Sequence, residues 1–181
     1  SKILIGNWKM NGTKADKEDM LKALKTVKSG NKIVLCLPFT LLCGENKGIS
    51  IGAQDVSSHE NGAYTGDISA TMLKEMGVEY VIVGHSERRT NHDETNEIVR
   101  QKATMAIKNG IIPIVCVGET MEEKNAGHTT SVIKKMLLES IPDNGEYIVA
   151  YEPRWAIGTG QTPTTNEIVS AVKTVFETLP N

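Results

Sequence analysis

The chain has 181 residues, of which 39% are hydrophobic and 23% are charged, and its formal net charge at pH 7 is −2. This length and composition are typical of one globular domain, which we expect to span residues 1–181. The charge balance favours no nucleic-acid partner and no apolar run is long enough to span a bilayer, so we expect neither nucleic acid nor membrane as a partner.

The first half of the chain alternates strand and helix signals. A strand at residues 3–5 is followed by the capping box Thr13-x-x-Asp16, which predicts a helix that runs to about Ser29 and ends at Gly30. The elements predicted next, in chain order, are a strand at Lys32–Leu37, a short helix at 41–46, a strand at 49–53, a helix at 69–76 that begins with the cap Ser69, and a strand at Tyr80–Val83.

The second half repeats the alternation. The predicted elements are a helix at 93–109, a strand at 111–117, a helix at 128–140, a strand at 147–151, and a last helix opened by the capping box Thr164-x-x-Glu167. One face of that helix carries Ile168, Val172, Val175, Phe176 and Leu179. Short apolar strands separated by helices predict an α/β fold with a parallel sheet covered by helices.

The three cysteines do not have the spacing of metal ligands. Cys36, Cys43 and Cys116 are odd in number, and two of them lie in apolar runs. We therefore expect buried free thiols, a reducing cytoplasmic location and no metal site.

Polar residues gather where the predicted strands end. The first strand is followed by Asn7 and Lys9, the fourth by His85, and the sixth by Glu152. Because the carboxyl ends of parallel strands share one edge of a sheet, we expect these groups to converge. A carboxylate base with an imidazole and an ammonium group suits proton abstraction beside a carbonyl. Taken singly, Lys9 also fits a solvated surface lysine and His85 a structural histidine.

The segment after Glu152 has the signals of a mobile loop. Pro153 and Pro163 bound it, and Gly158 and Gly160 lie inside it. These residues suit a lid whose backbone amides bind an anion. The alternative is an ordinary surface loop with turn glycines.

At these positions the sequence resembles the triosephosphate isomerase family. The resemblance runs from Lys2 to about Glu177, and its motifs stand in the family's order. The matching segments are 6–12 (GNWKMNG), 52–55 (GAQD), 61–69 (NGAYTGDIS), 84–89 (GHSERR), 116–119 (CVGE), 150–153 (AYEP) and 155–160 (WAIGTG).

The resemblance implies a phosphorylated triose substrate, dihydroxyacetone phosphate or D-glyceraldehyde 3-phosphate, and no cofactor. Glu152 matches the general base and His85 the electrophile, a neutral histidine for which this family is itself the established example. Lys9 matches the cation that binds the anionic substrate, and Asn7 matches a neighbouring donor. Gly158 matches the lid glycine whose amide meets the phosphate.

Further residues match the surroundings of the site. Thr65 lies in the loop that reaches the partner subunit in this family, which implies a homo-oligomer. The residues that match positions beside the histidine or in the lid are Ser86, Glu87, Pro153, Trp155, Ala156, Ile157, Thr159 and Gly160.

The chain departs from the family in length and at the lid hinge. A full (β/α)8 barrel typically needs about 250 residues, and the seventh and eighth βα units with their phosphate-binding loops are not among these 181. We therefore expect a TIM-barrel-like fold of about six βα units, closed or covered by oligomerisation, and weakened phosphate binding. Arg154 occupies a hinge position that is often apolar or acidic in the family. The alternatives are a non-catalytic oligomeric scaffold and an inactive fragment.

Overall fold

The computed structural model describes residues 2–28, 30–44, 46 and 48–179. The backbone forms two compact units. The first comprises residues up to Ile82 together with Met105–Pro113, and the second comprises Val83–Thr104 and the chain from Ile114 onward.

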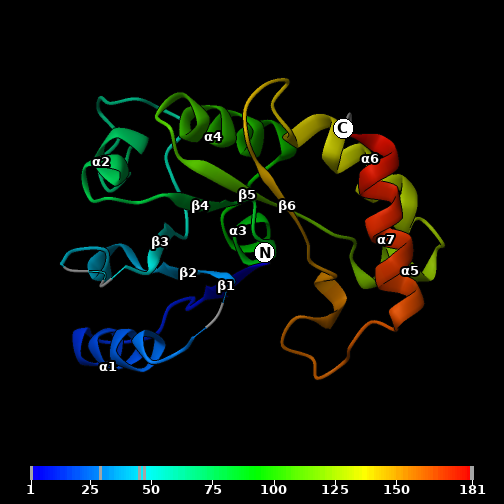
Figure 1. Ribbon diagram of the computed structural model, residues 1–181. Coiled ribbons are helices and arrows are strands. Elements are labelled where there is room, and N and C mark those ends of the chain that lie inside the picture. Colours follow the sequence, from blue (N-terminus) through cyan, green and yellow to red (C-terminus); the bar gives the residue numbers. More distant parts are fainter. Residues whose placement is uncertain (1, 29, 45, 47, 180–181) are drawn as a thin grey trace. The chain divides into compact units, whose positions relative to one another are not determined.

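The six predicted strands are all present, and Figure 1 shows them alternating with helices along the chain. The sheet order is β1-β2-β3-β4-β5-β6, so each strand neighbours the one that precedes it, and the pairings of β1 with β2, β2 with β3, β3 with β4, and β5 with β6 are parallel. This order confirms the α/β fold of six βα units. The strands are β1 Ile3–Asn7, β2 Lys32–Leu37, β3 Ser50–Ala53, β4 Tyr80–Val83, β5 Ile112–Val117 and β6 Ile148–Tyr151.

The helices begin where the sequence supplies caps. At the start of α1 the Thr13 side chain accepts a hydrogen bond from the Asp16 amide, and the Asp16 side chain accepts one from the Thr13 amide. Thr164 and Glu167 form the same capping box at the start of α7. The α-helices are α1 Lys14–Lys25, α2 Ala70–Glu75, α3 Ser86–Asn91, α4 Asn96–Lys108, α5 Met121–Asn125, α6 Thr129–Ser140 and α7 Thr165–Thr178, and the 3-10 helices are η1 Phe39–Leu41 and η2 Arg154–Ala156.

Three predicted helix bounds were wrong. The helix expected to reach Ser29, which lies outside the described residues, ends at Lys25. The helix expected from Asp93 begins at Asn96, because Asp93 has a φ of 53° and the Thr95 hydroxyl caps the Ile98 amide instead. Of the helix expected at 41–46, in which residue 45 lies outside the described residues, only Leu41 is helical, as the last residue of the 3-10 turn η1.

Two short helices were not predicted. The α3 sequence SERRTN has no apolar residue, so no hydrophobic periodicity reveals it. The α5 helix is opened by a capping box, Thr120 with Glu123, a signal that the sequence does contain.

Each unit has its own apolar core. In the first unit the core includes Val34, Ile51 and Val81, and in the second it includes Val115, Ile133 and Leu137, all nearly inaccessible to solvent. The thiols of Cys36 and Cys116 are buried as predicted, but Cys43 is exposed because it lies in a surface loop after η1. No helix within the described part of the chain is long and apolar enough to cross a membrane.

Candidate active site

The Glu152 carboxylate, directly after β6, lies against three hydrogen-bond donors at the start of α3. The Ser86 amide donates to Oε2 at 2.9 Å, the Ser86 hydroxyl donates to Oε1 at 2.9 Å, and His85 Nε2 lies 2.6 Å from Oε1. The side chains of Glu152 and His85 are each 11% exposed. Burial raises the pKa of Glu152, but the bonds from His85 and Ser86 outweigh it and leave the pKa below its ordinary value. The carboxylate is therefore ionised at neutral pH.

The hydrogen bonds of His85 define its tautomer. Its Nδ1 accepts from the Glu87 amide at 3.1 Å, which requires a lone pair on Nδ1. The Glu87 carboxylate is farther from Nδ1, at 3.6 Å. The ring proton then lies on Nε2, the nitrogen that faces Glu152. His85 is thus placed as a neutral imidazole that donates toward the carboxylate.

The ends of the neighbouring strands hold this pair in place. The Glu152 amide donates to the Val117 carbonyl at 2.8 Å. A Cβ on Gly118 would lie 1.8 Å from the Glu152 carbonyl oxygen, so only glycine allows β5 and the residue after β6 to approach this closely. Arg89, on α3, donates to the carbonyls of Gly84 and Cys116 at 2.7 and 3.2 Å. The GHSERR motif therefore includes a structural hydrogen-bond network as well as the candidate site.

The loop after Glu152 is anchored at its beginning through η2. Trp155 is buried, and its Nε1 donates to Glu119 Oε1 at 2.9 Å, while the Tyr151 hydroxyl donates to the same carboxylate at 3.1 Å. The Lys124 ammonium lies 3.4 Å from the Trp155 ring centroid. These contacts fix the Trp155 side chain at the start of the loop.

The middle of the loop is exposed and held by few contacts. Gly158 and Gly160 have φ values of 71° and 74°, which suit glycine. The Thr159 hydroxyl donates to the Trp155 and Ala156 carbonyls, both at 3.1 Å, and these bonds close the loop on itself. A loop that is anchored at its start and has exposed glycines in its middle is compatible with a lid.

Asn7 and Lys9 lie in the first unit, with Gln54. Asn7 Oδ1 accepts from the Lys9 amide at 2.9 Å, and Gln54 Nε2 donates to the Lys9 carbonyl at 2.9 Å. Lys9 has a φ of 53°, an uncommon conformation for a residue with a side chain. Such strain is often found at functional positions. Thr65, in the same unit, is exposed.

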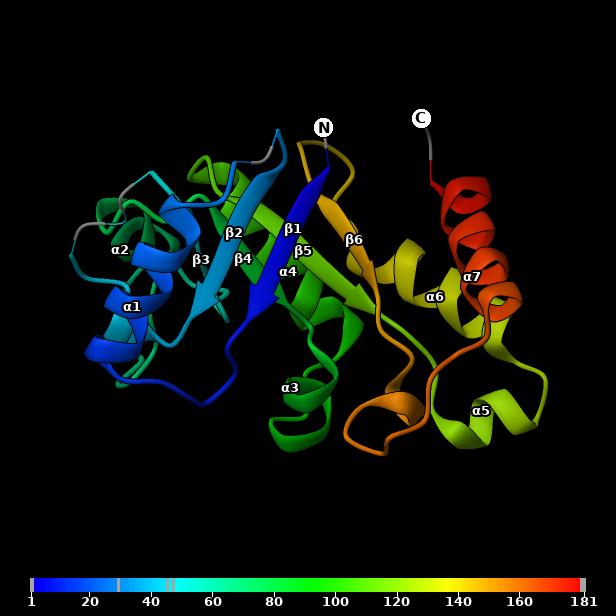
Figure 2. The same cartoon turned by 60° about the horizontal axis from the view of Figure 1, so that its bottom comes forward.

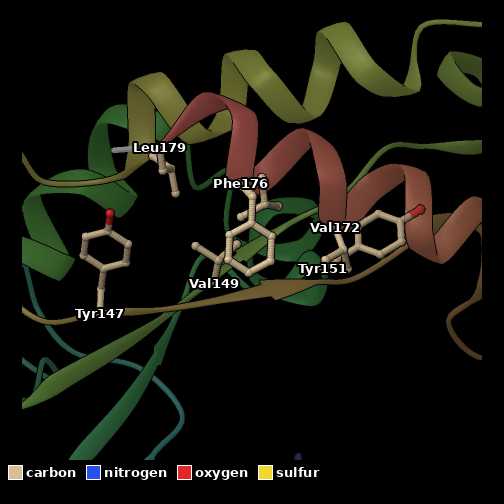
Figure 3. A pocket seen from close by; sticks show the side chains of 7 residues that line it. Tyr147, Val149, Tyr151, Val172, Phe176 and Leu179 are labelled. Atoms are coloured by element: carbon tan, nitrogen blue, oxygen red, sulfur yellow. The ribbon is translucent and has the colours of Figure 1, made fainter. Parts of the chain in front are cut away.

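The second unit also contains an apolar groove of about 410 Å³ between β6 and α7. Figure 3 shows Tyr147, which precedes β6, and Val149 of β6 facing Phe176 of α7 and Leu179, which follows that helix. Among the residues that the structure describes, no carboxylate, imidazole or ammonium group lines the groove. It is therefore a hydrophobic surface and not a candidate centre for acid–base chemistry.

No role was predicted for Glu119, which is buried and accepts hydrogen bonds from Tyr151 and Trp155. Its position was a usable signal, because Glu119 is the second residue after β5, near the strand end just as Glu152 directly follows β6.

Comparison with known proteins agrees with this geometry. The family model described as "Triosephosphate isomerase" matches residues 2–181. The triosephosphate isomerase of Delftia acidovorans is 49% identical over 175 residues, which are 90% of this chain and 71% of that protein. That of Alkaliphilus oremlandii is 44% identical over 190 residues, covering 97% of this chain and 77% of that protein.

A solved structure matches as well. The crystal structure of triosephosphate isomerase from Bartonella henselae matches with a TM-score of 0.84 and 36% identity, covering 96% of this chain and 73% of that one. The chain thus spans roughly seven tenths of the length of these relatives. It belongs to the triosephosphate isomerase family and is an isomerase.

Proposed function

We propose that the chain interconverts dihydroxyacetone phosphate and D-glyceraldehyde 3-phosphate through an enediolate, with Glu152 as the base and His85 as the electrophile. The observation that carries this proposal is the 2.6 Å contact between Glu152 Oε1 and His85 Nε2. It joins an ionised, nearly buried carboxylate to an imidazole N–H. Family membership supplies the triose phosphate substrate.

The reaction needs one proton moved between adjacent carbons. Glu152 takes the proton from the carbon beside the carbonyl, and the electron pair of that C–H bond forms the carbon–carbon double bond of the enediolate. His85 Nε2–H donates to the carbonyl oxygen as negative charge develops there. The hydroxyl proton on the carbon that lost its hydrogen moves to the former carbonyl oxygen through His85, whose Nε2 gives its proton to one oxygen and takes the proton from the other, and the first oxygen becomes the new carbonyl. The protonated Glu152 then returns its proton to the former carbonyl carbon, so the substrate is neither oxidised nor reduced overall.

Glu152 must change partners before it can act. Its oxygens accept from the Ser86 amide, the Ser86 hydroxyl and His85. We propose that the substrate carbonyl oxygen replaces the carboxylate as the acceptor at His85 Nε2. The carboxylate, freed from that donor, then turns toward the substrate carbon.

The remaining roles are proposed from the family motifs. Lys9 attracts the anionic substrate, Asn7 donates a hydrogen bond to it, and the Gly158 amide binds its phosphate when the lid closes and excludes water. For the 181-residue chain alone, these donors replace the usual loops of the last two βα units, so we expect a raised Michaelis constant relative to full-length relatives. We also propose a homo-oligomer, with Thr65 in the contact.

A coupled assay with glyceraldehyde 3-phosphate, comparing the wild-type chain with Glu152→Gln, tests the proposal. Glutamine keeps the size of the side chain but is not a base, so kcat should fall about 10³-fold while the fold, checked by circular dichroism, stays intact. Equal turnover by the two proteins would refute the role of Glu152. A folded wild-type chain without turnover would support the scaffold or fragment alternatives.

A further inference from the structure

We propose that Arg154 is a positioning residue: its hydrogen bond to Thr90 is a second attachment that keeps Glu152 in its hydrogen-bonded arrangement, and this bond must break when the lid hinge rearranges around substrate. The inference rests on the proposed function of Glu152 and extends it to the control of its movement.

The lid hinge is bound to one face of α3 at two points. Arg154 Nη2 donates to the Thr90 hydroxyl at 2.9 Å, and two residues earlier the Glu152 carboxylate accepts from the Ser86 hydroxyl at 2.9 Å. Ser86 and Thr90 are four residues apart in α3, so they lie on the same face, one turn from each other. Figure 2 shows the loop that follows β6 close to α3. Since the two bonds tie residues 152 and 154 to the same helix face, we infer that the Arg154 bond restrains the hinge backbone that carries Glu152.

The hinge is held by polar contacts beside an open cavity. A cavity of about 380 Å³ lies here, and its lining includes Ser86, Thr90, Glu122, Arg154, Trp155 and Ile157. A side chain that borders open space gives up few packing contacts when it moves. The hydrogen bond to Thr90 thus contributes a large share of what fixes the Arg154 side chain.

Glu122, which also lines this cavity, is a second attractive group for Arg154. Hydrogen bonds at the start of α5, from the backbone of Glu122 first and then from Thr120, lower the pKa of Glu122, and the charge of Arg154 adds to this effect. The Arg154 guanidinium is therefore drawn toward both α3 and α5. When it leaves Thr90, the carboxylate of Glu122 remains as a partner, so the charge stays compensated.

The hydrogen bond should oppose ligand binding if it must break. A contact that stabilises only the unliganded arrangement lowers the apparent affinity of any ligand that needs the other arrangement. Removing an exposed hydrogen bond of this type should shift the equilibrium about two- to fivefold. Thr90 is exposed, so replacing it should not disturb the core.

Four variants isolate this bond. Thr90→Val removes the hydroxyl with little change in shape, Thr90→Ser restores it, Arg154→Met removes the donor, and Glu122→Gln removes only the charge on α5. The measurements are exchange of the Arg154 and Ala156 amides in the free protein by NMR, the dissociation constant of phosphoglycolate, which resembles the enediolate, and kcat and KM separately. In Arg154→Met the exchange is read at Ala156.

Thr90→Val and Arg154→Met should exchange two- to fivefold faster at the hinge and bind phosphoglycolate two- to fivefold more tightly, while Thr90→Ser stays at the wild-type values. Glu122→Gln removes the partner of the released guanidinium, so it should exchange no faster and bind phosphoglycolate no more tightly than the wild-type chain. Wild-type exchange and affinity in Thr90→Val, or equal changes in Thr90→Ser, would overturn the inference. Amide exchange at the hinge is measured without substrate, so this test does not depend on catalysis. Faster exchange in Thr90→Val together with full activity of Glu152→Gln would support the Arg154–Thr90 attachment and reject the catalytic role of Glu152.

Discussion

Glu94 and Glu152 are two glutamates of the same unit whose side chains are little exposed, but the partners of Glu94 are charged and those of Glu152 are neutral donors. Glu94 Oε1 lies 2.6 Å from Arg88 Nε and 2.5 Å from Lys102 Nζ, and the Glu94 side chain is 4% exposed. Glu152 is bonded instead to the backbone and hydroxyl of Ser86 and to an imidazole. In both acids burial raises the pKa and the partners outweigh it, so both have a lowered pKa and are ionised at neutral pH.

The difference in partner fits a structural role for Glu94 and the catalytic role that we propose for Glu152. Breaking a buried ion pair leaves an uncompensated charge, so Glu94 is fixed in its contacts. The neutral donors around Glu152 can be exchanged for a substrate oxygen at much lower cost. A general base must be ionised and also free to move, and in this comparison only Glu152 meets both conditions.

After the removal of the Glu152 carboxylate itself, replacing His85 should give the largest loss of kcat. In His85→Gln the Nε2–H donor and its fixed direction are lost, and kcat should fall about 10²- to 10³-fold because the enediolate oxygen loses its stabilising group. His92→Gln, at the end of α3, is the matched control and should keep wild-type kcat. A fall of less than about threefold in kcat for His85→Gln would remove His85 from the mechanism.

Shortening the base should cost nearly as much. Glu152→Asp keeps the charge but withdraws the carboxylate by about one methylene, and a displacement of about 1 Å can cost 10²-fold in rate. We expect kcat to fall about 10²-fold in steady-state assays, with KM changed little. Glu177→Asp, at an exposed position of α7, should be neutral. An unchanged kcat in Glu152→Asp would mean that this carboxylate does not reach the substrate.

Glu94→Gln should affect stability and leave the chemistry intact. It leaves Lys102, whose side chain is 9% exposed, without its compensating charge, and this should lower the free energy of unfolding by about 3 kcal/mol. Urea unfolding measures the loss, with the exposed Glu97→Gln on α4 as the control. The kcat per folded molecule should stay at the wild-type value, and a large loss of kcat would contradict the contrast with Glu152.

Acid should weaken the fold gradually through these same carboxylates. The pKa of Glu94 is lowered in the folded protein, so its stabilising effect is complete above the unfolded pKa of about 4.5 and is lost as the pH falls through the folded pKa. Glu167, paired with Lys124, extends this range, since its pKa is lowered to about 2. Thermal unfolding measured from about pH 6 down to about pH 2 should show that Tm falls once the pH is below about 4.5. The fall should be less steep in Glu94→Gln. A Tm that rises on acidification would contradict a stabilising role for these ionised carboxylates.

The sequence predicted the sheet well because each strand is a continuous apolar run, and the bounds of β2 and β4 agree residue for residue. It predicted the candidate site through polar residues at strand ends. It could not predict α3, which lacks apolar periodicity and is capped by a histidine side chain. It also could not predict the partners of Glu152 and Arg154, because Ser86 and Thr90 come close to them only through tertiary structure.

The most direct test of Glu152 as the base is incorporation of deuterium from solvent. Wild-type chain in D2O should place deuterium on the carbon beside the carbonyl of dihydroxyacetone phosphate, detected by NMR, because the abstracted proton exchanges with solvent before it returns. Glu152→Gln should incorporate none above the uncatalysed rate. Equal incorporation by the two proteins would contradict a reaction that depends on the Glu152 carboxylate.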